Sequence, residues 1–228
     1  AILYDLGLEG DKKIRPGPEC GYSAADGASS ARASEGSVGA GAGATVGKMG
    51  RRGTSMKGGF GTASITLASG LTVAAAVAVN AAGDIVDPST GEIVAGARTL
   101  DATGFLDMRR VMRGESREGS DDPGEEAGPQ TGANTTIGIV ATNAGLTKAQ
   151  VTKVAQMAQD GLARTIYPAH TTGDGDVVFS LATGVWTGEA NVTVIGALAA
   201  DVMAEAILRA VRMAVGLPGI PSVSDLGN

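Results

Sequence analysis

Residues 134–142, Asn-Thr-Thr-Ile-Gly-Ile-Val-Ala-Thr, decide the fold of the second half of this chain. Residues 135–142 are predicted to form a strand, because β-branched residues dominate and Ile137, Ile139 and Ala141 alternate onto one face. The strand follows abruptly on residues 114–134, which are rich in acidic residues, Gly and Pro and lack apolar periodicity. That composition is typical of a solvated linker. The junction therefore places a hydroxyl residue, Thr135, first in a strand behind a loop.

The chain after this junction alternates strand and helix. Residues 147–163 are predicted to form a helix that begins with a capping box, Thr147 with Gln150 three positions later. Residues 176–182 are predicted to form a strand and residues 192–215 a second helix. Each helix carries one apolar stripe at helical spacing. The stripes comprise Val151, Val154, Ala155, Ala158 and Leu162 in the first helix, and Ala200, Met203, Ala204, Ile207 and Val211 in the second.

The chain before the linker contains mostly strand signals. Residues 60–68 and 71–79 are predicted to pair as a hairpin, with short strands following at 85–86 and 93–97. A short helix is expected over residues 24–33. Residues 1–6 (AILYDL) have the pattern of a buried strand and begin without Met, so we expect an N-terminal segment to be missing from this sequence.

Composition excludes several classes of function. The net charge is −6 with a sequence pI of about 4.8, and the one basic stretch, residues 48–57, is interleaved with Gly, so nucleic-acid binding is not expected. No apolar run reaches the roughly 18 residues of a membrane span. One Cys and one His predict no zinc site, and the Gly-rich residues 36–47 depart from the phosphate-loop pattern, so no metal or cofactor is expected. The lone thiol fits a cytoplasmic protein.

A hydroxyl residue at the start of a strand behind a loop is the arrangement that an N-terminal nucleophile requires. In that chemistry we expect the hydroxyl of Thr135 to attack the carbonyl carbon of Asn134, and water to hydrolyse the ester that forms. Cleavage frees an α-amine with an ordinary pKa of about 7.7–8.0, which can act as the base for the hydroxyl of the same residue. The residues alone leave a structural alternative open, since Asn-Thr is common at the start of strands.

The sequence resembles the self-processing family of L-aminopeptidase/D-esterases, β-peptidyl aminopeptidases and nylon-oligomer hydrolases. The resemblance is densest over residues 132–184, in the run from Asn134 to Asn143, in Tyr-Pro-Ala-His-Thr (167–171) and in Gly-Asp-Gly-Asp-Val-Val-Phe (173–179). Upstream it is supported by residues 41–48 and 78–84. The resemblance implies a layered α-β-β-α sandwich of the N-terminal-nucleophile type, with a larger subunit, residues 1–134, and a smaller one, residues 135–228, in one composite domain.

The resemblance also implies a nucleophile and its helpers. Thr135 is the nucleophile for self-cleavage after Asn134 and for substrate hydrolysis. Lys48 lies near its hydroxyl and polarises it or moves its proton. Asn80 donates its side-chain amide to the developing oxyanion. Read without the resemblance, Lys48 is a solvated loop lysine and Asn80 a turn residue.

Three further residues are implied in the same site. Asp174 and Asp176 position Lys48 and the free amine of Thr135, and Tyr4 contributes a hydroxyl. On the residues alone, the two aspartates form a polar turn and the tyrosine is a core residue. His170, the one histidine, is expected to be a packed or hydrogen-bonded structural residue, because it follows Pro168 in a connection between a helix and a strand.

The expected activity is hydrolysis of amide bonds in short peptides, amino-acid amides or related oligomers, without cofactors. The family implies a homo-oligomer, often a tetramer. Two alternatives remain open at this point: an acyltransferase that uses the same threonine, as in ornithine acetyltransferases, and a non-catalytic structural protein. The substrate class itself, α-peptide, β-peptide, pantetheine-like amide or synthetic oligomer, is not determined.

Overall fold

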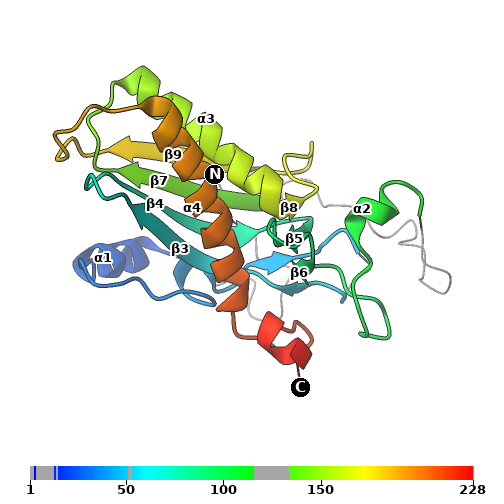
Figure 1. The fold of residues 1–228 in the computed structure, drawn as a ribbon. Coiled ribbons are helices and arrows are strands. Elements are labelled where there is room, and N and C mark those ends of the chain that lie inside the picture. Colours follow the sequence, from blue (N-terminus) through cyan, green and yellow to red (C-terminus); the bar gives the residue numbers. More distant parts are fainter. Residues whose placement is uncertain (1–2, 4–12, 14, 51–52, 116–133, 228) are drawn as a thin grey trace.

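A four-stranded sheet forms the centre of the described part of the chain, which comprises residues 3, 13, 15–50, 53–115 and 134–227 of a computed structural model (Figure 1). Its strand order is β3 (Gly59–Thr66), β4 (Thr72–Asn80), β7 (Thr135–Thr142) and β9 (Val177–Ala182). β3, β4 and β7 are successively antiparallel, and β9 runs parallel to β7. The predicted hairpin over residues 60–79 and the two strands after the linker are confirmed.

Two long helices cover one face of this sheet (Figure 1). α3 (Lys148–Thr165) lies over β9, and α4 (Val192–Arg212) lies over β3 and β4. Glycine permits this close approach: a Cβ atom at Gly61 in β3 would overlap the carbonyl oxygen of Ala206 in α4. The strand residues that face the helices form the core together with the stripe predicted for α4.

The helix ends follow from local and long-range partners. The predicted capping box is present at the start of α3, where the Thr147 hydroxyl accepts from the Gln150 N–H and the Gln150 side chain accepts from the Thr147 N–H. α4 ends at Arg212, three residues before the predicted end. Ala214 N–H donates to Val211 O at 3.4 Å, three residues back, so the regular i−4 pattern stops there, and Val215 N–H then donates to Ser37 Oγ at 2.9 Å in an N-terminal segment.

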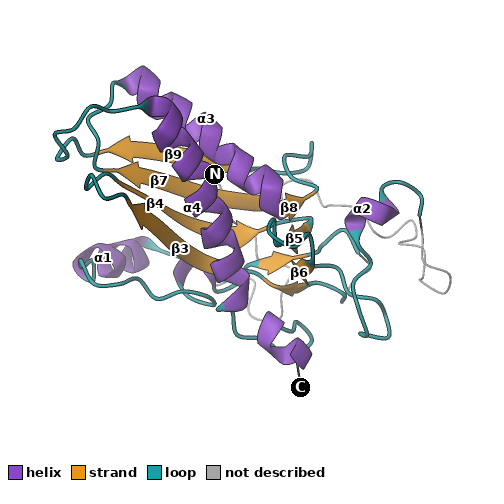
Figure 2. Cartoon of the chain, in the orientation of Figure 1, coloured by secondary structure: helices purple, strands orange, loops and turns teal. Residues whose placement is uncertain are grey.

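Smaller elements complete the fold (Figure 2). β5 (Asp84–Val86) pairs with β6 (Ile93–Ala95) and with β8 (Ile166–Tyr167), a strand that the sequence did not predict, and β1 (Thr45–Val46) pairs with β2 (Met56–Lys57). The N-terminal helix lies earlier than the predicted 24–33, since Pro18 occupies its first turn. The remaining elements are α1 (Pro18–Asp26), η1 (Gly39–Gly41), α2 (Met108–Val111) and η2 (Val223–Gly227).

The face of the large sheet opposite the helices is apolar and partly open. Ile139 in β7 and Phe179 and Leu181 in β9 are 39%, 54% and 40% exposed, respectively. A sheet-on-sheet sandwich adds its second layer on such a face. None of the helices in the placed residues combines the length and the apolar character needed to cross a bilayer.

Candidate active site

Thr135 is the first residue of β7 and is buried, with 3% of its surface exposed. Its direct cross-strand partner in β4 is Asn80, the last residue of that strand. The antiparallel register of β4 and β7 therefore brings together two residues that the sequence singled out separately.

The side chain of Asn80 is held in one orientation. Its Oδ1 atom accepts hydrogen bonds from Thr45 N–H at 3.0 Å and from Lys48 Nζ at 2.8 Å. Because a backbone N–H is always a donor, the oxygen of the amide must face Thr45, and the NH₂ group turns the other way. Asn80 is fully buried, so the orientation of its amide donor is fixed by protein groups.

Lys48 reaches the same residue from the loop after β1. Besides Oδ1, its Nζ atom donates to the backbone oxygen of Asn80 at 2.9 Å. Burial lowers the pKa of Lys48 to about 7, against the opposite effect of the Asp174 and Asp176 carboxylates. A lysine with this pKa is substantially neutral near pH 7 and can accept a proton.

The loop that carries Lys48 is fixed by the chain that follows β4. Gly47 N–H donates to Gly83 O at 3.0 Å, and Met49 N–H donates to Ala82 O at 3.2 Å. Lys48 and the residues that hold the backbone on either side of it thus come from two segments that are adjacent only in the folded chain. Solvation of Lys48, the alternative that the sequence left open, does not fit this half-buried, multiply bonded position.

The peptide bond between Asn134 and Thr135 is enclosed. Asn134 is 1% exposed, and its carbonyl oxygen accepts from Thr135 Oγ1 at 2.7 Å and from Gly175 N–H at 2.8 Å. Asn134 forms a parallel bridge with Asp174, so the segment before β9 lies beside the junction. A Cβ atom at Gly175 would lie only 2.7 Å from Thr135 Oγ1. The hydroxyl therefore has room only because residue 175 is glycine.

The two predicted aspartates flank Gly175 and have different partners. Asp176 Oδ1 accepts from Thr136 N–H at 2.8 Å, and Asp174 Oδ2 accepts from Thr171 N–H at 2.7 Å. Burial, followed by the neighbouring charge of Asp174, raises the pKa of Asp176. Asp174 Oδ1 is buried and has no hydrogen-bond partner among the placed residues. A buried carboxylate oxygen of this kind can accept a hydrogen bond from a cationic group.

His170 contacts Asp176 from the solvent-exposed side of the site. Its Nδ1 atom lies 3.2 Å from Asp176 Oδ2, and its backbone N–H donates to the same oxygen at 3.4 Å. Its side chain is 38% exposed, and its backbone has a positive φ of 55°. This hydrogen-bonded position agrees with the structural role expected for His170.

Two buried charged residues escaped the sequence reasoning. Lys57 is fully buried, and its Nζ atom donates to Ala42 O and Ala44 O, both at 2.8 Å, which fixes the chain that leads to Lys48. In the sequence it stands out only as part of the Gly-interleaved basic stretch of residues 48–57. The signal that could have found it is its position between Met56 and the glycines 58–59, in a short buried strand.

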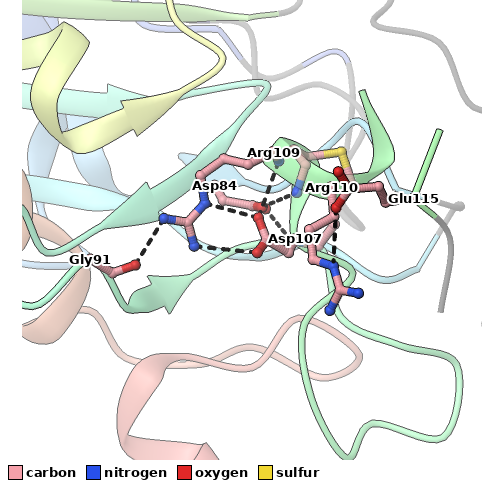
Figure 3. A network of polar contacts seen from close by, with 8 residues as sticks. Asp84, Gly91, Asp107, Arg109, Arg110 and Glu115 are labelled. Carbon is pink, nitrogen blue, oxygen red and sulfur yellow. Dashed lines mark hydrogen bonds and ion pairs between the residues drawn. The ribbon is translucent and has the colours of Figure 1, made fainter. Parts of the chain in front are cut away.

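Asp84 is the second such residue, and it belongs to a polar network around Asp107 and Arg109 (Figure 3). Its carboxylate accepts from Ala97 N–H at 2.9 Å and Met108 N–H at 2.8 Å. Burial raises the pKa of Asp84 to about 6. Asp84 holds the backbone of residues 96–97 through the Ala97 N–H. The loop of Lys48 packs closely against this backbone, because a Cβ atom at Gly47 would overlap it.

Tyr4 and the greater part of the acidic linker, residues 116–133, lie outside the described residues, and so does all of the predicted strand 1–6 except Leu3. The roles expected for them remain predictions. Lys48, Asn80, Thr135, Asp174 and Asp176 are the predicted residues that the structure brings together.

Comparison with known proteins agrees with this geometry. Residues 4–223 match peptidase family S58. The chain is 42% identical to an uncharacterised aminopeptidase of Mycobacterium leprae, with 97% of this chain and 62% of that protein covered. It is 30% identical to a 6-aminohexanoate-oligomer endohydrolase of Paenarthrobacter ureafaciens, with 92% and 59% covered. The chain thus spans less than two thirds of the length of these relatives.

Solved structures establish the fold class. A Burkholderia β-aminopeptidase superimposes with a TM-score of 0.56 at 24% identity, covering 89% of this chain and 56% of the other. An L-aminopeptidase D-Ala-esterase/amidase from Ochrobactrum anthropi, described as a variant of the Ntn-hydrolase fold, gives 0.57 at 19% identity, covering 90% and 54%. The predicted layered α/β fold of the N-terminal-nucleophile type is confirmed. Together with the match over residues 4–223, this places the chain in peptidase family S58.

Proposed function

We propose that this chain carries the catalytic residues of an amide-bond hydrolase, an aminopeptidase or amidase that cuts itself between Asn134 and Thr135. The observation that carries the proposal is the contact of 2.7 Å between Thr135 Oγ1 and the carbonyl oxygen of the preceding residue, at a buried junction next to Lys48 and Asn80. The names of the relatives, aminopeptidase and oligomer endohydrolase, support the same class of reaction.

Self-cleavage begins with the removal of the Thr135 hydroxyl proton by the neutral amine of Lys48. The oxygen attacks the carbonyl carbon of Asn134, and the carbonyl electron pair moves to the carbonyl oxygen. Collapse breaks the bond to the Thr135 nitrogen, which takes a proton and becomes an α-amine, and leaves an ester between Asn134 and the hydroxyl oxygen. Water then hydrolyses this ester, giving the Asn134 carboxylate and restoring the hydroxyl.

The same hydroxyl acts on substrates after cleavage. The α-amine of Thr135 and Lys48 share the role of base, and the α-ammonium form finds an acceptor in Asp174 Oδ1. The amide of Asn80, whose oxygen end is occupied by Thr45 and Lys48, donates to the oxyanion of the substrate. Substrates of this mechanism are short peptides, amino-acid amides or related amide oligomers.

Two properties accompany the proposal as predictions: assembly into a homo-oligomer, for which a tetramer is the expected form, and a cytoplasmic location.

Intact mass spectrometry of the purified protein tests the central step. We expect two fragments, of which the smaller begins at Thr135, and hydrolysis of an amino-acid p-nitroanilide by the cut protein. A Thr135→Ala variant should remain a single chain without activity. A wild-type chain that stays uncut, or a variant that is cut at the same bond, would contradict the proposal.

A further inference from the structure

We infer that the backbone N–H of Gly175 is the oxyanion donor of the self-cleavage step, and that it serves the carbonyl of Asn134 separately from the donor that serves substrates. This inference rests on the proposed self-cleavage. Gly175 was not among the residues expected in the site, because a backbone donor leaves no signature in side-chain chemistry.

The first support is contact with the reacting atom. Gly175 N–H donates to the carbonyl oxygen of Asn134 at 2.8 Å, so this donor already contacts the reacting atom in the uncut chain. This oxygen gains negative charge when Thr135 attacks. Asn134 is 1% exposed, so water cannot take over the stabilisation, and a fixed dipole acts more strongly where water is excluded.

The second support is the order of the strands. β7 lies between β4 and β9, so the two edges of its backbone face opposite neighbours. The Asn134 carbonyl points to the β9 side, where Gly175 lies, whereas Asn80 is the partner of Thr135 on the β4 side. One carbonyl cannot point to both neighbours. Asn80 thus lies on the opposite side of the junction from Gly175, and the scissile carbonyl of the chain itself takes its backbone donor from Gly175.

The third support is that residues 175–176 form hydrogen bonds on both sides of the scissile bond. Gly175 N–H holds the carbonyl before the bond, and Asp176 Oδ1 holds Thr136 N–H after it, at 2.8 Å. The missing side chain of Gly175 also leaves space for the attacking hydroxyl, because a Cβ atom would lie 2.7 Å from Thr135 Oγ1. Gly175 thus supplies both the donor and the open space, and the next residue, Asp176, supplies the acceptor.

The decisive experiment replaces Gly175 by glycolic acid, which exchanges the N–H for an ester oxygen without changing the shape of the residue. Cell-free translation with nonsense suppression gives such a chain, and intact mass spectrometry follows its self-cleavage over time. We expect cleavage to slow by about 10²–10³-fold, as for the loss of one oxyanion donor elsewhere. Circular dichroism and the unfolding temperature report whether the ester chain is folded.

A matched control carries the same ester at Gly184, whose N–H donates to Ala144 O at 3.2 Å at the far end of the same strand pair. It loses a comparable hydrogen bond away from the scissile peptide, so its cleavage rate should stay within a few-fold of wild type. Equal slowing in the two ester chains, or wild-type cleavage in the Gly175 ester, would overturn the inference.

A second variant covers the case in which the Gly175 ester does not fold. Gly175→Ala keeps the N–H but places a methyl group against the Thr135 hydroxyl, and it should block cleavage. Cleavage at the wild-type rate would show that Gly175 does not lie on the scissile bond and would overturn the inference. An uncut wild-type chain would instead contradict the proposed function, so the two failures are distinguishable.

Discussion

Lys48 Nζ donates to both oxygens of Asn80, to the side-chain Oδ1 at 2.8 Å and to the backbone oxygen at 2.9 Å. The contact connects the candidate base with the candidate oxyanion donor, directly opposite Thr135 in the sheet register. Substitutions at either residue should therefore alter the pH dependence of the reaction as well as its rate.

The pH dependence of self-cleavage should follow the neutral form of Lys48. Burial lowers the pKa of Lys48 to about 7, so the fraction of neutral amine falls about tenfold per unit below that pH and approaches a plateau above it. Cleavage rates measured by mass spectrometry across pH 5–9 should rise and level off accordingly. In Lys48→Met the rate should fall by about 10²–10⁴-fold. A Lys48→Met chain that keeps the wild-type profile would remove Lys48 from the mechanism.

Asn80→Asp should separate the two reactions. A carboxylate next to Lys48 raises the pKa of that lysine, so the midpoint of the self-cleavage profile should move upward from pH 7. The substitution also removes the amide donor, and substrate hydrolysis by the cut protein should fall by about 10²–10³-fold at every pH. Asn80→Ala is the control, because it removes the donor without adding charge. An unchanged midpoint in Asn80→Asp would contradict the coupling between the two side chains.

Glu35 should stabilise the fold through its ion pair with Arg209. Its carboxylate also accepts from Thr62 N–H and Oγ1, and the hydrogen bond from Arg209 is the largest cause that lowers the pKa of Glu35 to about 2. A depressed carboxyl pKa gives stability that is present above the ordinary value of 4.5 and is lost as pH falls toward 2. Glu35→Gln should lower the free energy of unfolding at pH 7 by about 1.5–3 kcal/mol.

The control for this prediction is Asp201→Asn. Asp201 pairs with Arg164 at 2.7 Å, but both side chains are about half exposed, so its loss should change the free energy of unfolding by only about 0–1 kcal/mol. Urea unfolding at pH 7 and pH 3 measures both. If the two variants lost the same free energy of unfolding at pH 7, the ion pair of Glu35 would contribute no more than an exposed pair.

Gly61→Ala should disrupt the contact between the sheet and α4. The added methyl group overlaps the Ala206 carbonyl oxygen, a backbone atom that moves only with the helix, and overpacking of this kind costs about 1–3 kcal/mol. Gly21→Ala is the control, because nothing lies within 4 Å of the added atom. Thermal unfolding should show a lower midpoint for the first variant only, and equal midpoints would mean that α4 does not approach β3 this closely.

The sequence alone predicted the local elements well. The strand over residues 135–142 coincides with β7, and the capping box at Thr147 marks the start of α3. These features depend on alternation, helical spacing and caps, which act between residues within a few positions of one another. The end of the last helix was predicted less well. α4 ends at Arg212, and the N–H of Val215, the predicted last residue, donates instead to Ser37 in a distant segment.

The sequence also drew attention to the Asn134–Thr135 junction, and resemblance supplied Lys48, Asn80, Asp174 and Asp176. Only the tertiary structure decided how these groups meet. The order β4-β7-β9 places Asn80 on one side of Thr135 and Gly175 on the other, and burial then lowers the pKa of Lys48. Strand order and burial arise from contacts between residues far apart in the chain, which no local pattern encodes.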